Sequence, residues 1–290
     1  MKRWYKSKGI PNTKTFLLKY ASELTKTRRK EDEKAVLSKY LLHNKDYVAK
    51  PTHKSGSSGV FIVKYDKERQ KRLMGYGGDS IDDDYRKKDI AERLVEDLHK
   101  KAHDYESWAL KNVKPGVMLE ERFTDFKNGK YAATEFKVFT IWGRAWITNW
   151  RQGSYRPGLV HRNGTIAKWD GQHKDITSLP EYVDWGRVIS IAERLGRNKD
   201  LFRTDVFVGV PADSPPLRED ATLEDQRDTV QYVVSEVAFH PTSEFGSHNG
   251  IFDEGARLWL AGYKIGNYKV VPNTEVPHAF LEKGMLSEED

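Results

Sequence analysis

The sequence contains no cysteine, which excludes disulfides, zinc sites built on thiolates and cysteine nucleophiles together. It has no apolar run of about 18 residues, so we expect no membrane-spanning helix. The first residues, M-K-R-W-Y-K, lack the apolar core of a secretory signal peptide. These absences favour a cytoplasmic protein.

The motifs of the best-known nucleotide-binding and metal enzymes are missing as well. There is neither a G-x-x-x-x-G-K-[ST] nor a G-x-G-x-x-G phosphate loop. The segment H-R-N at 161–163 resembles the start of a kinase catalytic loop, but its aspartate is missing and no D-F-G follows. There is no H-E-x-x-H, and we interpret His240 and His248 as loop histidines without zinc-like companions.

The composition is that of a globular chain, with 38% hydrophobic, 12% aromatic and 32% charged residues. A chain of 290 residues can bury a substantial core and form one large domain or two interleaved lobes. The 49 basic and 43 acidic residues give a net charge of +6, which suits an anionic nucleotide or an acidic glycan. We do not expect nucleic acid as the partner, because a run of charge is usually a solvated surface.

A candidate phosphate-binding element extends from Tyr47 to Val63, Y-V-A-K-P-T-H-K-S-G-S-S-G-V-F-I-V. A short strand ends in Lys50 and Pro51, a loop of small residues follows, and a β-branched and aromatic run forms a returning strand. The bare N–H groups of such a loop can close over phosphate, and Lys50 can place one compact charge on it. The alternative is an ordinary hairpin with a surface lysine.

The remaining patterns predict an α+β fold rather than a parallel doubly wound sheet. Helical spacing covers 1–46, where Phe16, Leu17 and Tyr20 recur, and a helix at 181–195 is closed by Gly196 as its C′ residue. The other expected elements are a long helix at 85–110, strands at 117–123, 201–207 and 229–239, a hairpin at 135–150, an irregular stretch at 151–180 and a helix near 252–260.

Two carboxylates stand on strands made otherwise of Val, Phe and Tyr. Alternation places Asp205 on one face with Arg203, and Glu236 on one face with Tyr232 and Val234. A buried carboxylate is costly unless it binds a cation. Two of them can hold Mg²⁺, whose remaining ligands are water and phosphate oxygens, which points to transfer of a γ-phosphoryl group. The alternative is that Asp205 forms a structural ion pair with Arg203 or Lys137.

The chain resembles the ATP-grasp superfamily, and within it the TupA-like branch associated with teichuronopeptide synthesis. The resemblance lies in the blocks Y-V-A-K-P-T-H-K-S-G-S-S-G, W-A-L-K-N-V-K-P-G-V-M-L-E-E-R-F, E-F-K-V-F-T-I-W-G, and I-A-E-R-L into F-R-T-D-V-F followed by V-S-E-V-A-F-H-P. It runs from about Tyr47 to Gly250 in the family's order. It implies two α+β lobes that grip ATP, with an N-terminal helical segment at 1–46, a flap lobe at 47–123 and a C-terminal lobe with metal-binding strands at 124–290.

The resemblance also implies roles for single residues. Lys50 would contact the α- and β-phosphates under the loop, Asp205 and Glu236 would bind Mg²⁺, and Arg203 would stabilise the transferring phosphoryl group. The remaining residues implied to bind the nucleotide are the loop (Ser55, Gly56, Ser57, Ser58 and Gly59), the adenine hinge (Glu120, Glu121 and Phe123), the ribose carboxylate (Glu135) and Lys137.

Two departures from the superfamily pattern stand out. The last strand of the superfamily usually carries E-x-N, but the third position here is Ala238, which cannot ligate a metal. The chain also begins close to the Gly9-Ile10-Pro11 turn, so we expect the N-terminal substrate lobe to be missing or abbreviated.

By this resemblance the chain is an ATP- and Mg²⁺-dependent carboxylate–amine ligase that acts through an acyl phosphate. Its acceptor would be a small molecule or a glycan, such as a sugar acid or an amino acid in polysaccharide biosynthesis. A kinase on the same fold, acting on a sugar or other alcohol, is the alternative. A third interpretation is a non-catalytic module that binds a nucleotide or glycan.

Overall fold

The computed structural model describes residues 2–24, 29–41, 45–54, 59–66, 71–76, 90–100, 111–126, 132–153, 155–167, 176–239 and 249–264. The chain forms two compact units. The first comprises residues 1–12, 124–210 and 216–290, and the second comprises residues 13–123 and 211–215. No helix in the described part of the chain is long and apolar enough to cross a membrane.

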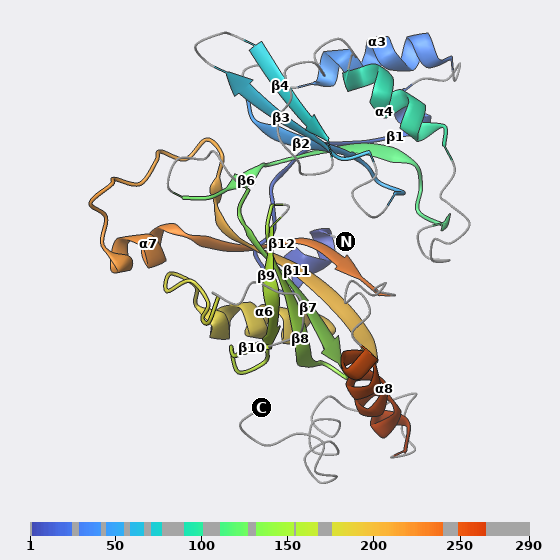
Figure 1. Cartoon of the computed structure of the whole chain (residues 1–290). Helices are drawn as coiled ribbons and strands as arrows, with labels where there is room; N and C mark the ends of the chain where they lie inside the picture. Colours follow the sequence, from blue (N-terminus) through green and yellow to red (C-terminus); the bar gives the residue numbers. More distant parts are fainter. Residues whose placement is uncertain are drawn as a thin grey trace. The chain divides into compact units, whose positions relative to one another are not determined.

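The second unit is built on a five-stranded antiparallel sheet of order β1-β5-β2-β3-β4 (Figure 1). Its core contains Leu37 and Leu94 from two helices and Tyr47, Val63 and Leu119 from the sheet, so the helices cover one sheet face. Its elements in chain order are β1 (Thr15–Tyr20), α2 (Ala21–Leu24), α3 (Lys30–Tyr40), β2 (Tyr47–Pro51), β3 (Phe61–Asp66), β4 (Lys71–Tyr76), α4 (Ile90–Leu98) and β5 (Gly116–Glu120).

The first unit is built on a seven-stranded sheet of order β10-β9-β8-β7-β11-β12, in which β6 also pairs with β11. Neighbouring strands along this order run antiparallel. Its elements are α1 (Lys2–Ser7), β6 (Phe123–Thr124), β7 (Thr134–Ile141), β8 (Arg144–Gln152), β9 (Tyr155–His161), β10 (Ile166–Ala167), α6 (Trp185–Gly196), β11 (Leu201–Pro211), α7 (Leu223–Thr229), β12 (Gln231–Ala238) and α8 (Asn249–Lys264).

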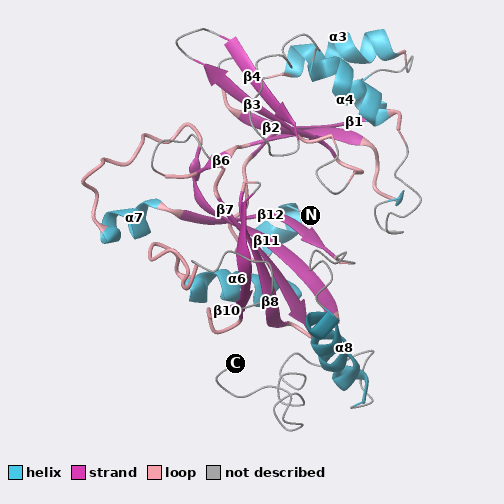
Figure 2. Cartoon of the chain, in the orientation of Figure 1, coloured by secondary structure: helices cyan, strands magenta, loops and turns pink. Residues whose placement is uncertain are grey.

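The two faces of the seven-stranded sheet are covered differently. On one face lies α6 (Figure 2), whose apolar residues join Phe136, Val138 and Val206 in the main core. On the other face α8 covers only one end, where Leu258 packs near Ile141 and the helix start packs near Phe139. The rest of this second face carries the polar side chains described below.

Several predictions are confirmed at the level of secondary structure. The fold combines helices with antiparallel sheets, as an α+β pattern requires. The hairpin predicted at 135–150 is formed by β7 and β8, with the turn at Trp142 and Gly143, both at positive φ. The helix predicted at 181–195 corresponds to α6, and the strands predicted at 201–207 and 229–239 correspond to β11 and β12.

The N-terminal segment 1–46, predicted to be helical, is helical only in part. Helices α1 (Lys2–Ser7), α2 (Ala21–Leu24) and α3 (Lys30–Tyr40) form within it, but the helix predicted from Phe16, Leu17 and Tyr20 is wrong. Residues 15–20 form β1, because this short segment pairs with β5 along its length, from Thr15 to Tyr20. The spacing of Phe16, Leu17 and Tyr20 fits one turn of helix and a six-residue strand equally well. The pairing with β5 therefore determines that the segment is a strand. The preceding residues up to Asn12 belong to the other unit, where Tyr5 and Ile10 join the main core.

Three further expectations need correction. The long helix expected at 85–110 ends at Leu98, and the flanking parts of that range lie outside the described residues. The stretch expected to be irregular at 151–180 contains β9 and β10. Gly196 is the last helical residue rather than the C′ residue, and a Cβ atom there would lie 2.2 Å from Thr140 Oγ1. The glycine is therefore needed for close helix–sheet packing.

Candidate functional site

A cluster of charged side chains lies on the second face of the seven-stranded sheet, away from the end that α8 covers. Cross-strand register places Lys137 on β7 opposite Asp205 on β11, and Asp205 opposite Glu236 on β12. Arg203 lies two residues from Asp205 on the same strand and the same face. We call Glu135, Lys137, Arg203, Asp205 and Glu236 the polar cluster.

A β-bulge places Glu236 in this cluster. Asp205 is paired with Glu236 but Val206 is paired with Val234, so Ser235 is an extra residue on β12. The expectation that Glu236 shares a face with Val234 is therefore wrong. Val234 is fully buried in the main core, whereas Glu236 lies with Asp205 on the opposite face. The Ser235 hydroxyl donates a hydrogen bond to the Asp205 carbonyl oxygen at 3.2 Å.

Asp205 is the most deeply buried member of the polar cluster, with 1% of its surface exposed. Arg203 donates to both of its carboxylate oxygens, from Nε to Oδ1 at 2.7 Å and from Nη2 to Oδ2 at 3.0 Å. Lys137 Nζ lies 3.5 Å from Oδ2. The structure therefore contains the ion pairs of Asp205 with both basic side chains that the sequence suggested as an alternative to metal binding.

Glu236 extends the cluster towards solvent. Its carboxylate Oε1 lies 3.9 Å from Arg203 Nη2, and its side chain is 53% exposed. The Arg203 guanidinium thus stands within ion-pair distance of both carboxylates, one buried and one accessible.

Glu135 is coupled electrostatically to the same group. Burial raises its pKa to about 7, an effect that Lys137 opposes and Asp205 reinforces. Arg151, directly opposite Glu135 on β8, also lowers this pKa, while the more distant Glu236 raises it. Shifts of this kind are common where charges are gathered for function, although structural ion pairs produce them too.

Mg²⁺ suits the two carboxylates in donor type and number. It is usually bound through one or two protein carboxylates, with water and substrate phosphates as the other ligands. Asp205 and Glu236 are opposite each other on adjacent strands and could supply these two oxygens. Among the described residues no group of three or more His, Asp or Glu side chains gathers as a metal site. Ala238 adds no ligand, as expected.

The predicted phosphate and adenine residues belong to the second unit. Lys50 Nζ lies 2.8 Å from Glu120 Oε2, and the glutamate side chain is only 5% exposed. The Glu121 carboxylate accepts a hydrogen bond from the backbone N–H of Lys14 at 3.3 Å. Phe123 is buried. Within the second unit, the structure brings Lys50 and Glu120 into contact.

The predicted phosphate loop is described only at its ends. Ser55, Gly56, Ser57 and Ser58 lie outside the described residues. Gly59 has φ +75°, and a Cβ atom there would lie 2.6 Å from Asp97 Oδ2, so only glycine fits.

The residues before the loop are anchored to α4. His53 is 3% exposed, and its Nε2 lies 3.2 Å from the Asp97 carbonyl oxygen. The side chain of Lys54 forms an ion pair with Asp97. The sequence did not predict that Asp97 anchors the residues before the loop. The helical spacing of α4 gives no indication of which strand end its terminus will contact.

Asn149 and Arg151 were missed as well. They lie opposite Lys137 and Glu135 on β8, and Asn149 is only 5% exposed. The alternation in A-W-I-T-N-W-R-Q places both on the polar face, a signal that was available in the sequence.

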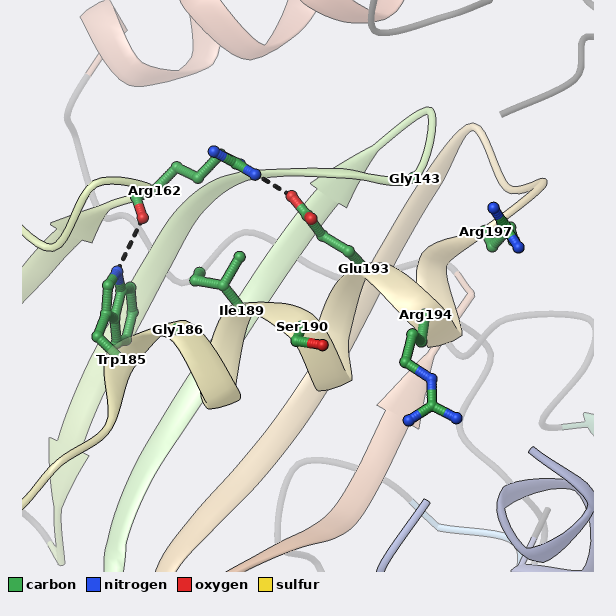
Figure 3. A pocket seen from close by; sticks show the side chains of 9 residues that line it. All are labelled: Gly143, Arg162, Trp185, Gly186, Ile189, Ser190, Glu193, Arg194 and Arg197. Atoms are coloured by element: carbon green, nitrogen blue, oxygen red, sulfur yellow. Dashed lines mark hydrogen bonds and ion pairs between the residues drawn. The ribbon is translucent and has the colours of Figure 1, made fainter. Parts of the chain in front are cut away.

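A separate groove of about 550 Å³ runs along α6, on the other side of the sheet (Figure 3). The ion pair from Arg162 Nε to Glu193 Oε1, at 2.9 Å, crosses it, and the Trp185 indole N–H donates to the Arg162 carbonyl oxygen at 2.8 Å. The groove contains none of the predicted site residues. Its lining residues are Gly143, Arg162, Trp185, Gly186, Ile189, Ser190, Glu193, Arg194 and Arg197.

No protein-family model matches the chain, and no curated protein matches it. Similar solved structures include those of the ATP-grasp ligase PsnB. A complex with a phosphomimetic precursor variant, Mg and ADP has 11% identity and a TM-score of 0.34, over 86% of this chain and 50% of that chain. A complex with precursor peptide PsnA2 and AMPPNP has 12% identity and a TM-score of 0.33, over the same shares.

The chain therefore spans about half the length of these PsnB structures. A third structure, with a minimal precursor, has a TM-score of 0.31.

Proposed function

We propose that this chain is an ATP- and Mg²⁺-dependent enzyme of the ATP-grasp type, and that it acts as a carboxylate–amine ligase. The polar cluster carries the proposal. Three carboxylates and two cations, with Asp205, Arg203 and Lys137 nearly fully buried, stand on one face of the seven-stranded sheet. Burying these charges costs free energy unless each one is bound to a ligand or to a partner of opposite charge. Phosphoryl transfer needs positive and negative groups at the same site.

The proposed roles follow from charge and position. Asp205 and Glu236 hold Mg²⁺, which neutralises charge on the phosphates of ATP when bound. Lys50 contacts the α- and β-phosphates, and Arg203 binds the transferring phosphoryl group. Glu135 binds the ribose hydroxyls, and Glu120, Glu121 and Phe123 bind adenine. These roles come from the resemblance, and the residues present are chemically suited to them.

The reaction has two steps. A carboxylate oxygen of the substrate attacks the γ-phosphorus of ATP, the bond to the bridging oxygen breaks, and ADP leaves. An amine nitrogen then attacks the acyl carbon of the resulting acyl phosphate, inorganic phosphate leaves with the C–O bonding electrons, and the amine loses a proton. Arg203 and Lys137 stabilise the negative charge on the phosphoryl oxygens in both steps.

Product analysis tests this function. The full chain is incubated with MgATP and a panel of carboxylates and amines, including sugar acids, amino acids and peptides, and the products are followed by phosphorus NMR and mass spectrometry. ADP, free phosphate and an amide in equal amounts support the ligase. A stable phosphoester would instead identify a kinase, and absence of ADP with every acceptor would favour a binding module. Asp205→Asn is the inactive control.

A further inference from the structure

The Arg203 guanidinium occupies the place where a cation bound by Asp205 and Glu236 would be expected. It takes both oxygens of Asp205, at 2.7 and 3.0 Å, and its Nη2 also lies 3.9 Å from Glu236 Oε1. The predicted metal ligands are thus already bridged by a cation that belongs to the chain.

This arrangement makes Mg²⁺ binding a competition. A second cation next to a guanidinium would be repelled over a few ångströms in a poorly solvated place, because Arg203 and Asp205 are both nearly fully buried. Lys137, 3.5 Å from Asp205 Oδ2, adds a further positive charge. Free Mg²⁺ would have to displace Arg203 from Asp205, and the guanidinium would then lack its bidentate partner in a buried environment.

A polyphosphate changes this balance. Its oxygens offer a planar guanidinium the same bidentate partner as a carboxylate. They also supply ligands that two carboxylates leave open on Mg²⁺. The polyphosphate can therefore accept Arg203 at the moment that the metal takes its place at Asp205.

We propose that Arg203 acts as a built-in counter-cation, so that the site admits Mg²⁺ only together with a polyphosphate and not as the free ion. The inference rests on the proposed function, because it takes Asp205 and Glu236 as the metal ligands. It adds an order to binding: Arg203 moves from Asp205 to phosphate as the metal–polyphosphate complex enters. Arg203 is then a switch between two anions in addition to a phosphate ligand.

The first experiment measures metal binding without nucleotide, with Mn²⁺ as the probe, by electron paramagnetic resonance and calorimetry. Wild-type protein should bind Mn²⁺ only in the millimolar range. Arg203→Met, which keeps the side-chain length but removes the charge, should bind at least tenfold more tightly. Adding Glu236→Gln should remove this gain. Lys137→Met is the matched control, and its gain should be smaller because Nζ lies farther from Asp205 and contacts one oxygen.

A second measurement is made on the wild-type protein, and a variant serves only to assign the signal. The Nε–Hε NMR signal of Arg203 in the wild-type protein, assigned by its loss in Arg203→Lys, should stay unchanged with millimolar Mg²⁺ alone. It should shift when Mg²⁺ and a non-hydrolysable ATP analogue are added together.

Two results would overturn the inference and have different consequences. If wild-type protein binds free Mn²⁺ as tightly as Arg203→Met, or if Mg²⁺ alone shifts the Arg203 signal, the counter-cation role is wrong while the proposed function stands. If the ATP analogue with Mg²⁺ neither binds nor moves the signal, the proposed function fails and the inference fails with it.

Discussion

At the scale of single residues, the side chains proposed to bind the nucleotide and metal are held in ion pairs. Lys50 is held by Glu120 at 2.8 Å, and Asp205 is held by Arg203 and Lys137. Each pair lies on the sheet face opposite the apolar core of its unit. The same side chains that stabilise the unliganded fold are therefore those proposed to exchange partners when a nucleotide binds.

Lys50→Ala should lower the affinity for an ATP analogue at least tenfold while the protein stays folded. The lysine is proposed to contact phosphate, and its charge cannot be replaced by a methyl group. Calorimetric titration measures the affinity and circular dichroism the fold. Lys19→Ala, a lysine of β1 that no proposed role uses, is the matched control. Equal affinity in wild-type protein and Lys50→Ala would remove Lys50 from the nucleotide site.

Glu135→Gln should change the pH dependence of stability. Because burial raises the pKa of Glu135 from 4.5 to about 7, the folded state holds this proton more tightly than the unfolded state does. The contribution of Glu135 is therefore fully present below about pH 4.5 and is lost as pH rises towards 7. The loss is about 3 kcal/mol, at about 1.4 kcal/mol for each unit between the two pKa values.

The glutamine variant lacks this titration, so its free energy of unfolding relative to wild type should rise between pH 4 and pH 8. Urea denaturation at several pH values measures the difference. A difference that stays constant over this range would show that Glu135 is not perturbed.

At the scale of secondary-structure elements, the close packing of α6 on β7 gives a further prediction. Gly196→Ala should destabilise the protein by about 1–3 kcal/mol, because the new methyl group would overlap Thr140. Gly186→Ala in the same helix is the control, since its Cβ would lie 3.4 Å from Asp184 Oδ1 and needs little adjustment. Thermal unfolding compares the two variants. Equal melting temperatures would mean that the helix can move away from the sheet.

Elements with strong local patterns could be predicted from the sequence, and elements set by distant partners could not. The β7–β8 hairpin combines alternation with a Gly143 turn, and α6 combines an apolar stripe with Asp184, which accepts a hydrogen bond from the Arg187 N–H as N-cap. In contrast, β1 is a strand because it pairs with β5, a segment about 100 residues later in the chain. No local pattern reports that partner.

The candidate site, too, could be predicted from the sequence only where a local pattern determines it. Strand alternation was enough to group Arg203 with Asp205, and Glu135 with Lys137. It was not enough for Glu236, because the bulge at Ser235 depends on how β12 fits β11. It also could not show that Arg203 takes both oxygens of Asp205, which follows from side-chain conformation in a crowded place.

At the scale of the whole chain, two separate apolar cores predict two unfolding events. Leu37 belongs to one core and Leu195 to the other, and both are fully buried. Replacing either with alanine should cost about 2–5 kcal/mol. Leu37→Ala should lower one calorimetric transition, and Leu195→Ala should lower a different one. If both variants shift a single common transition, the two units unfold as one cooperative body.

The bulge at Ser235 has a consequence for how this chain tolerates change in length. It divides β12 into two half-strands of opposite parity, so that residues before it and after it exchange their inward and outward sets. Deleting this one serine would restore strict alternation. Glu236 would then follow Val234 directly, so Val234 would stay in the core and Glu236 would keep its place opposite Asp205 at the polar cluster. This strand can therefore lose Ser235 without moving Glu236 from the polar cluster, because Ser235 is the extra residue of the bulge and no paired residue changes its side.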